Sequence, residues 1–320
     1  MKCIKLLSIA VALFGITMVS SAQTVQDVAD ARNKGSELMA AGNLEGAITE
    51  FEKCVELAKQ VGEDAEEYSM LVESALPGLY LQNAKNILNA KDYNAALQAL
   101  EATIAAAEKY NNAGVKTEAE KSIPQIYYAL GATEYKADNW DAAIPLLEKA
   151  IALDPNSARS YFLMGFCYQE LKNEDKMAEN YKLAIEKGNA IGDQTSANNA
   201  KTKLFAYYYT PGAQAKNAQK WDEAISLLSK AAEVDDTNPT IFQALSSCFN
   251  SKKNWDSAIA NGEKALELNP KTSDGIYYEL GTAYAGKNNA IKACEYFKKV
   301  ENEPYLKGAK YQIEVALKCK

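Results

Sequence analysis

Histidine, cysteine and paired carboxylates most often carry chemistry in proteins, and this chain has a restricted supply of them. Its 320 residues include six cysteines and no histidine. Ser-His and Cys-His nucleophile pairs and histidine-ligated metal sites are therefore excluded. No two cysteines have the C-x-x-C spacing of a zinc site, and no glycine-rich phosphate loop occurs. The sequence predicts no catalytic residue, no cofactor and no metal site, and hence no enzyme.

The densest acidic cluster is the remaining place for a catalytic carboxylate pair, such as glycoside hydrolysis needs. It consists of Glu63, Asp64, Glu66 and Glu67. Acids are also favoured at the positive end of a helix dipole, so we interpret the cluster as a solvated helix start. A carbohydrate-binding or glycan-processing envelope protein is kept as an alternative, although the sequence lacks an evident pair of buried, facing acids.

The first 22 residues are typical of a secretory signal peptide. Lys2 and Lys5 precede an apolar run from Leu6 to Val19, and small residues end at Ala22 before Gln23. The run is shorter than the roughly 20 residues of a membrane-spanning helix, which disfavours the alternative of an anchor. We expect cleavage after Ala22 and export to the periplasm, the cell surface or the medium of a bacterium.

The charge and hydropathy of the whole chain limit its partners. The formal net charge is −7. An acidic surface repels phosphate backbones, so no nucleic-acid partner is expected. No later segment is long and apolar enough to span a bilayer, so we expect no stable membrane insertion after cleavage.

The remainder of the chain, residues 23–320, is internally repetitive. The segments Tyr127–Pro155 and Phe242–Pro270 share an aromatic start, a central Trp-Asp, spaced alanines and a closing proline. Both resemble the tetratricopeptide repeat, a helix-turn-helix of about 34 residues. The resemblance implies an all-α fold, a right-handed α-solenoid of about seven such repeats.

The register of these repeats can be followed through the chain. Repeats start near Val28, Pro77, Pro124, Ala158, Phe205, Pro239 and Asp274. The eighth position then holds a small residue in every repeat: Gly35, Ala84, Gly131, Gly165, Gly212, Ser246 and Gly281. A small side chain there allows the two helices of a repeat to approach closely, while larger residues at the fourth and twenty-fourth positions fill the space between repeats.

Three repeat steps are longer than the others. The added segments are 62–76, 111–123 and 192–204, and the first two are rich in good helix formers, which predicts extra helical turns. Proline lacks an amide donor, so we expect a kink or break at Pro77 and Pro124 and a distorted repeat at Thr210-Pro211-Gly212. Asn43, Asn139 and Asn254 are expected to cap second helices.

After the seventh repeat, residues 304–320 predict a terminal capping helix, which solenoids need to cover their last apolar face. Cys294 and Cys319 then fall on elements that pack together, so this pair could form a disulfide. The alternative is that all five cysteines left after cleavage are small apolar filling. Cys167 and Cys248 are expected to be too far apart to bond.

In proteins that resemble this one, the first helix of each repeat lines a concave groove. Carried over by position, that groove would contain aromatic and basic residues, the usual anchors of protein interfaces. The candidate partner-binding residues are Tyr128, Tyr135, Lys136, Arg159, Phe162, Phe166, Tyr209, Lys216 and Tyr278. For Phe162 and Phe166, packing between repeats is an equal alternative.

The resulting hypothesis is an exported scaffold or adaptor that holds a protein or peptide in this groove. A self-assembling structural protein is a further alternative, since the lengthened helices could support homo-oligomers.

Overall fold

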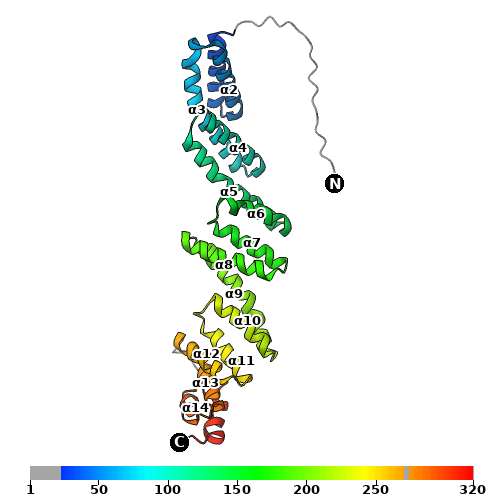
Figure 1. The fold of residues 1–320 in the computed structure, drawn as a ribbon, viewed down its shortest axis with the longest axis vertical. Helices are drawn as coiled ribbons and strands as arrows, with labels where there is room; N and C mark the ends of the chain where they lie inside the picture. Colours follow the sequence, from blue (N-terminus) through cyan, green and yellow to red (C-terminus); the bar gives the residue numbers. More distant parts are fainter. Residues whose placement is uncertain (1–22, 270–273, 320) are drawn as a thin grey trace, which may run out of the picture. The chain divides into compact units, whose positions relative to one another are not determined.

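The computed structural model describes residues 23–269 and 274–319, and these form helices and turns with no strand. The predicted signal peptide, residues 1–22, lies outside the described residues. The chain divides into two compact units after Ile126, here called the N-terminal unit and the C-terminal unit. Figure 1 shows the helices in chain order.

The described helices form consecutive pairs, which confirms the predicted all-α fold of helix-turn-helix repeats. The N-terminal unit contains α1 (Val25–Ala40), α2 (Leu44–Val61), the 3-10 turn η1 (Glu63–Ala65), α3 (Glu66–Asn89) and α4 (Tyr93–Lys109). Helix α5 (Ala113–Lys136) crosses the division between the units.

The C-terminal unit continues the same alternation of first and second helices. It contains α6 (Trp140–Leu153), α7 (Ala158–Glu170), α8 (Glu174–Ile191), α9 (Gln194–Asn217), α10 (Trp221–Val234), α11 (Pro239–Ser251), α12 (Trp255–Leu268), α13 (Asp274–Gly286) and α14 (Ala290–Phe297). Within the described residues, α1 to α14 make seven pairs. Each helix from α6 to α14 packs on its neighbours in the chain, as expected for a repeat array.

The chain ends in a short α15 (Leu306–Tyr311) followed by a π-helical turn, η2 (Gln312–Ala316). The predicted closing helix over 304–320 is therefore shorter than expected. It changes from an α-helix to a π-helical turn at Gln312. It still packs over the last repeat, because Ala309 is fully buried in a cluster with Ile276 and Phe297.

The turns that join the two helices of each pair share one backbone conformation. The residue before each N-cap has a positive φ, from Gly42 (79°) and Lys91 (63°) to Asn288 (60°). In most of these turns, though not before α6 and α10, the following N-cap supplies a side-chain acceptor: Asn43 Oδ1 accepts from the Gly46 amide at 3.0 Å and Asn254 Oδ1 from Ser257 at 3.3 Å.

Asn139 caps α6 by position only. Its side-chain nitrogen donates to Glu134 at 2.9 Å, and its side chain accepts no bond from a helix amide. The predicted capping role is thus confirmed for Asn43 and Asn254 and is only positional at Asn139.

The glycines at the eighth position allow close packing within a repeat. A Cβ added to Gly165 would lie 2.7 Å from Cδ1 of Tyr181, and one on Gly281 would lie 2.7 Å from Cδ1 of Phe297. Tyr181 and Phe297 occupy the twenty-fourth position. That position therefore covers the glycine of its own repeat, whereas the sequence assigned it only to the space between repeats.

Three helices are unusually long: α3, α5 and α9 each have 24 residues. The predicted extra turns over 62–76 and 111–123 are thus helical, apart from the entry turns. The prolines Pro77, Pro124 and Pro211 lie inside these helices without breaking them, so a break is excluded, whereas the kinks at Pro77 and Pro124 and the distorted repeat at Pro211 stay predictions. Long helical flanks on both sides hold the backbone, since proline removes only one donor of each ladder.

Candidate functional site

Three aromatic rings from α5, α6 and α7 lie in mutual contact. The rings of Tyr135 and Phe166 have centroids 5.1 Å apart and meet edge to face. Trp140, the first residue of α6, lies 5.5 Å from Tyr135 and 6.0 Å from Phe166. All three side chains are half-buried. The two pairs that involve Tyr135 have the edge-to-face arrangement that ring quadrupoles favour, whereas Trp140 and Phe166 are tilted at 54°.

Two cations lie over rings on the same elements. The guanidinium of Arg159 in α7 is 4.5 Å from the Tyr128 ring of α5. The ammonium of Lys203 in α9 is 5.2 Å from the Phe166 ring. Both cationic residues are exposed. Cation–π contacts at exposed sites each contribute about 0.5–1 kcal/mol, and they hold the basic groups beside the rings.

Helical spacing places these residues on one face. Tyr128 and Tyr135 are two turns apart on α5, and Arg159, Phe162 and Phe166 follow an i, i+3, i+7 pattern on α7. Together with Lys203 they form what we call the aromatic–basic face: Tyr128, Tyr135, Arg159, Phe162, Phe166 and Lys203.

The rings of this face also pack against the hydrophobic core. Phe162 lies 5.9 Å from Tyr181, which is fully buried, and Tyr128, Tyr135, Phe162 and Phe166 all pack against the main cluster of the C-terminal unit. Burial raises the pKa of the Tyr135 hydroxyl. These four residues are therefore only partly exposed and pack against the core, which was the alternative that the sequence left open for Phe162 and Phe166.

The other candidate residues lie elsewhere. Tyr209 stacks on Phe205 of its own helix at 5.1 Å. Tyr278 packs between Phe297 and Tyr305, each at 5.6 Å, within the cluster that closes the chain. Lys136 is exposed in the last turn of α5.

Lys216 belongs to a second, polar cluster between α9, α11 and α13. The side-chain nitrogen of Asn250 donates to the Glu279 carboxylate at 2.7 Å and to the Glu279 backbone carbonyl at 2.9 Å. Burial raises the pKa of Glu279, and the Ser247 hydroxyl and the charge of Lys216 oppose that shift. Of these residues, the sequence analysis had placed only Lys216 among the candidate partner-binding residues.

The sequence overlooked Glu279 and Lys203. Glu279 is at the sixth position of its repeat, to which the resemblance assigns no partner contact, and Lys203 lies in the added segment 192–204, outside the register. A count of charged residues on the inserted helical turns could have indicated Lys203. No sequence signal distinguishes Glu279 from the many solvated acids of the chain.

The three cysteines Cys54, Cys167 and Cys248 are buried thiols. Burial raises the pKa of both Cys167 and Cys248 to about 11, which keeps them protonated and poorly nucleophilic at neutral pH. They fill small apolar positions, as one sequence hypothesis held.

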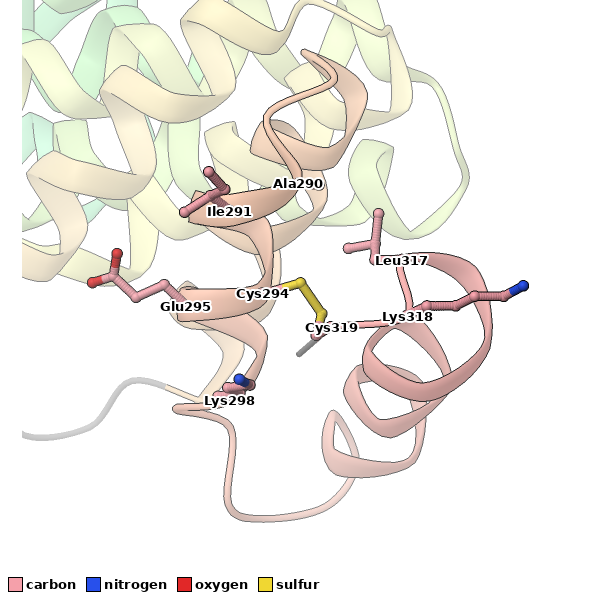
Figure 2. A pocket seen from close by; sticks show the side chains of 8 residues that line it. All are labelled: Ala290, Ile291, Cys294, Glu295, Lys298, Leu317, Lys318 and Cys319. Atoms are coloured by element: carbon pink, nitrogen blue, oxygen red, sulfur yellow. A yellow bond between two sulfur atoms is a disulfide. The ribbon is translucent and has the colours of Figure 1, made fainter.

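Cys294 and Cys319 form a disulfide with Cα atoms 5.7 Å apart. Figure 2 shows it joining α14 to the C-terminal segment. A pocket of about 530 Å³ lies between these two elements, lined by Ile291, Leu317 and the disulfide among others. The bond ties the last segment to the final helix pair.

Within residues 23–269 and 274–319, no group of three or more cysteine and acidic side chains is arranged to hold a metal ion. In the same part of the chain, no helix has the length and apolar character needed to cross a membrane.

Family models of the tetratricopeptide repeat match four stretches of the chain. They cover residues 33–61, 124–157, 146–179 and 275–302. The matches lie in both the N-terminal and the C-terminal unit.

Comparison with individual proteins gives partial similarities. The heat shock protein STI1 of Saccharomyces cerevisiae is 33% identical over 33% of this chain and 18% of its own length. A DnaJ homolog subfamily C member 7 homolog of Dictyostelium discoideum is 22% identical over 64% of this chain and 40% of its own length. The chain thus spans less than half the length of either relative.

Among solved structures, YrrB, described as a TPR protein with an unusual peptide-binding site, is 18% identical. It covers 62% of this chain and 95% of its own, with a TM-score of 0.33.

Proposed function

Because the chain is a tetratricopeptide-repeat protein, we propose that it is an exported scaffold that holds a protein or peptide partner on the aromatic–basic face. The repeats themselves support a protein-interaction scaffold in general. The finer parts of the proposal are the face on which the partner binds and the compartment in which the protein acts. The proposed role is binding, without a catalytic step.

One observation supports the proposed location of the binding face. Three successive first helices, α5, α7 and α9, bring half-buried rings and exposed cations into contact. Aromatic and arginine side chains contribute most of the energy in protein interfaces when a partner excludes water from them. The core already restricts these ring side chains. They would therefore lose little further conformational entropy when a partner binds.

The cations indicate the chemistry of the partner. Arg159 and Lys203 are exposed, and each lies over an aromatic ring. A peptide segment with apolar or aromatic anchors flanked by carboxylates would complement this face, because the carboxylates would pair with both cations. The signal-like N-terminus supports an extracytoplasmic partner.

The test is a charge reversal that spares the core. Alanine at the rings would also remove packing, so the informative variant is Arg159→Glu with Lys203→Glu. A matched control, Lys182→Glu with Lys310→Glu, makes the same charge change at exposed positions on α8 and α15. Each protein is immobilised and incubated with an extract of the native host, and the captured proteins are identified by mass spectrometry.

We expect the wild type and the control to capture the same partner and the Arg159/Lys203 variant to lose it. Circular dichroism checks that all three proteins are equally folded. Equal capture by all three would refute the proposed face.

A further inference from the structure

An apolar cleft lies at the end of the chain, between α14 and the C-terminal segment that follows η2. Its volume is about 530 Å³, and its apolar lining consists of Ala290, Ile291, Leu317 and the disulfide between Cys294 and Cys319. Figure 2 shows the disulfide joining the two sides, with Ile291 on α14 and Leu317 on the facing segment. Ile291 is 84% exposed, the highest value for a large hydrophobic residue among those described. We call this surface the C-terminal cleft, and its open apolar lining is typical of a surface that another molecule covers.

The surroundings of the C-terminal cleft are basic. Lys298 and Lys318 belong to its lining, and residues 298–320 contain six lysines and three acids. The acid of the lining, Glu295, already forms an ion pair with Lys299 at 3.3 Å. An apolar cleft with an excess of lysines is complementary to apolar side chains that are flanked by carboxylates, because opposite charges guide the two surfaces together.

A surface with that composition occurs in the N-terminal unit of the same chain, where η1 meets α3. We call it the acidic–apolar patch, and it lines a hollow of about 430 Å³ with Glu63, Glu66, Glu67, Met70 and Leu71. Met70 is 61% exposed and Leu71 is 57% exposed. The helix dipole explains acids at the start of α3, but it does not explain two adjacent apolar side chains in water.

Neighbouring residues do not balance the charge of the acidic–apolar patch. Residues 60–84 contain five acids and neither lysine nor arginine. The ion pairs described in the N-terminal unit and along α5 use other acids, namely Glu50, Glu52, Glu108, Glu118 and Glu120. The patch therefore combines exposed apolar side chains with carboxylates that take part in none of these pairs, and the C-terminal cleft supplies both an apolar lining and lysines.

We propose that the acidic–apolar patch of one copy of this chain docks into the C-terminal cleft of a second copy. Met70 and Leu71 pack against Ile291, and the carboxylates of the patch face the lysines of residues 298–320. The two surfaces differ, so the contact is head-to-tail and leaves each copy with one surface for a further copy. The inference goes beyond the proposed function, because it assigns a second partner, the chain itself, to surfaces that exclude Arg159 and Lys203.

Sedimentation velocity of the purified protein over a wide range of concentrations tests the contact. We expect the average mass of the wild type to rise with concentration past that of a dimer, and to fall when salt screens the charges. Met70→Lys and Ile291→Asn each change one exposed side chain, so they spare the core, and each should weaken association by about tenfold or more. The same two changes at Leu153, which is exposed on α6 outside both surfaces, are the controls and should associate as the wild type does.

Mixing the two variants distinguishes a head-to-tail contact from a symmetric one. The Met70→Lys protein keeps an intact C-terminal cleft, and the Ile291→Asn protein keeps an intact acidic–apolar patch. An equimolar mixture should therefore form dimers with one copy of each variant and stop at that size, although each variant alone stays monomeric at the same concentration.

Three results would overturn the proposal. A wild type that stays monomeric at every concentration would leave the C-terminal cleft to a different occupant. Association of the Met70→Lys or Ile291→Asn variant that equals the wild type would place the contact elsewhere. A mixture of the two variants that remains monomeric, with both proteins folded by circular dichroism, would exclude the head-to-tail arrangement.

Discussion

Glu279 shows how a single buried acid can link stability to pH. Burial raises its pKa in the folded protein above the ordinary value of 4.5. The folded state therefore keeps this proton to a higher pH than the unfolded state. From the linkage relation, the contribution of Glu279 to stability falls as pH rises from about the unfolded pKa through the folded pKa. Above its folded pKa the ionised group opposes folding.

The Glu279→Gln variant should remove this dependence. We expect its free energy of unfolding, relative to the wild type, to increase as pH rises above about 4.5 and to level off above the folded pKa of Glu279, because glutamine carries no charge to desolvate. Urea unfolding at several pH values, followed by circular dichroism, measures the difference. Glu233→Gln provides the control, with a difference that does not change with pH. A constant difference for Glu279→Gln would contradict the argument.

At the scale of the helix pair, the eighth-position glycine determines how closely two helices approach. Gly165→Ala would place a methyl group 2.7 Å from the fully buried ring of Tyr181, so something must shift. We expect a loss of about 1–3 kcal/mol, as for other overpacked cores. Gly78 of α3 has nothing within 4 Å of an added Cβ, so Gly78→Ala should stabilise by about 0.5–1 kcal/mol.

Thermal unfolding of both alanine variants separates packing from helix propensity. The two substitutions are chemically identical and both lie inside helices, so propensity alone predicts the same sign. A stabilised Gly165→Ala variant would mean that α7 and α8 can move apart without cost.

The last element depends on a covalent bond. The disulfide between Cys294 and Cys319 closes a sequence separation of 25 residues, and Figure 2 shows it as the link between α14 and the end of the chain. Cross-links of this kind contribute about 2–4 kcal/mol. In the Cys294→Ser, Cys319→Ser variant we expect faster amide hydrogen exchange in α15 and η2. Exchange in α7 and α8 should stay the same, and unchanged exchange in α15 would argue against a stabilising role.

The elements were predictable to different degrees. The helix pairs follow from small residues at the eighth position and from caps such as Asn43, since both act within one repeat. The unbroken helices at Pro77 and Pro211 were not predictable, because proline acts locally whereas the packing of long flanking turns decides the outcome. Of the candidate site, helical periodicity placed the rings of α5 and α7 on one face.

For the whole molecule, the proposed export gives a direct test. If residues 1–22 are removed as a signal, the protein recovered from its native host should begin at Gln23. Replacing Ala22 with leucine puts a large side chain at the cleavage position and should block processing. Mass spectrometry of the N-terminal peptide distinguishes the two forms. An intact Met1 in the wild type would contradict export by this route.

The sequence by itself determined that the chain is all-α, that it repeats, and where its helix pairs lie. Its periodic small residues and caps act between neighbours in the chain, so their effect can be followed without coordinates. Only the tertiary structure decided that Lys203 meets Phe166, that Asn250 holds Glu279 and that Cys294 bonds Cys319. These contacts join residues of different helix pairs or of the C-terminal segment, and Lys203 also lies in an inserted segment outside the repeat register.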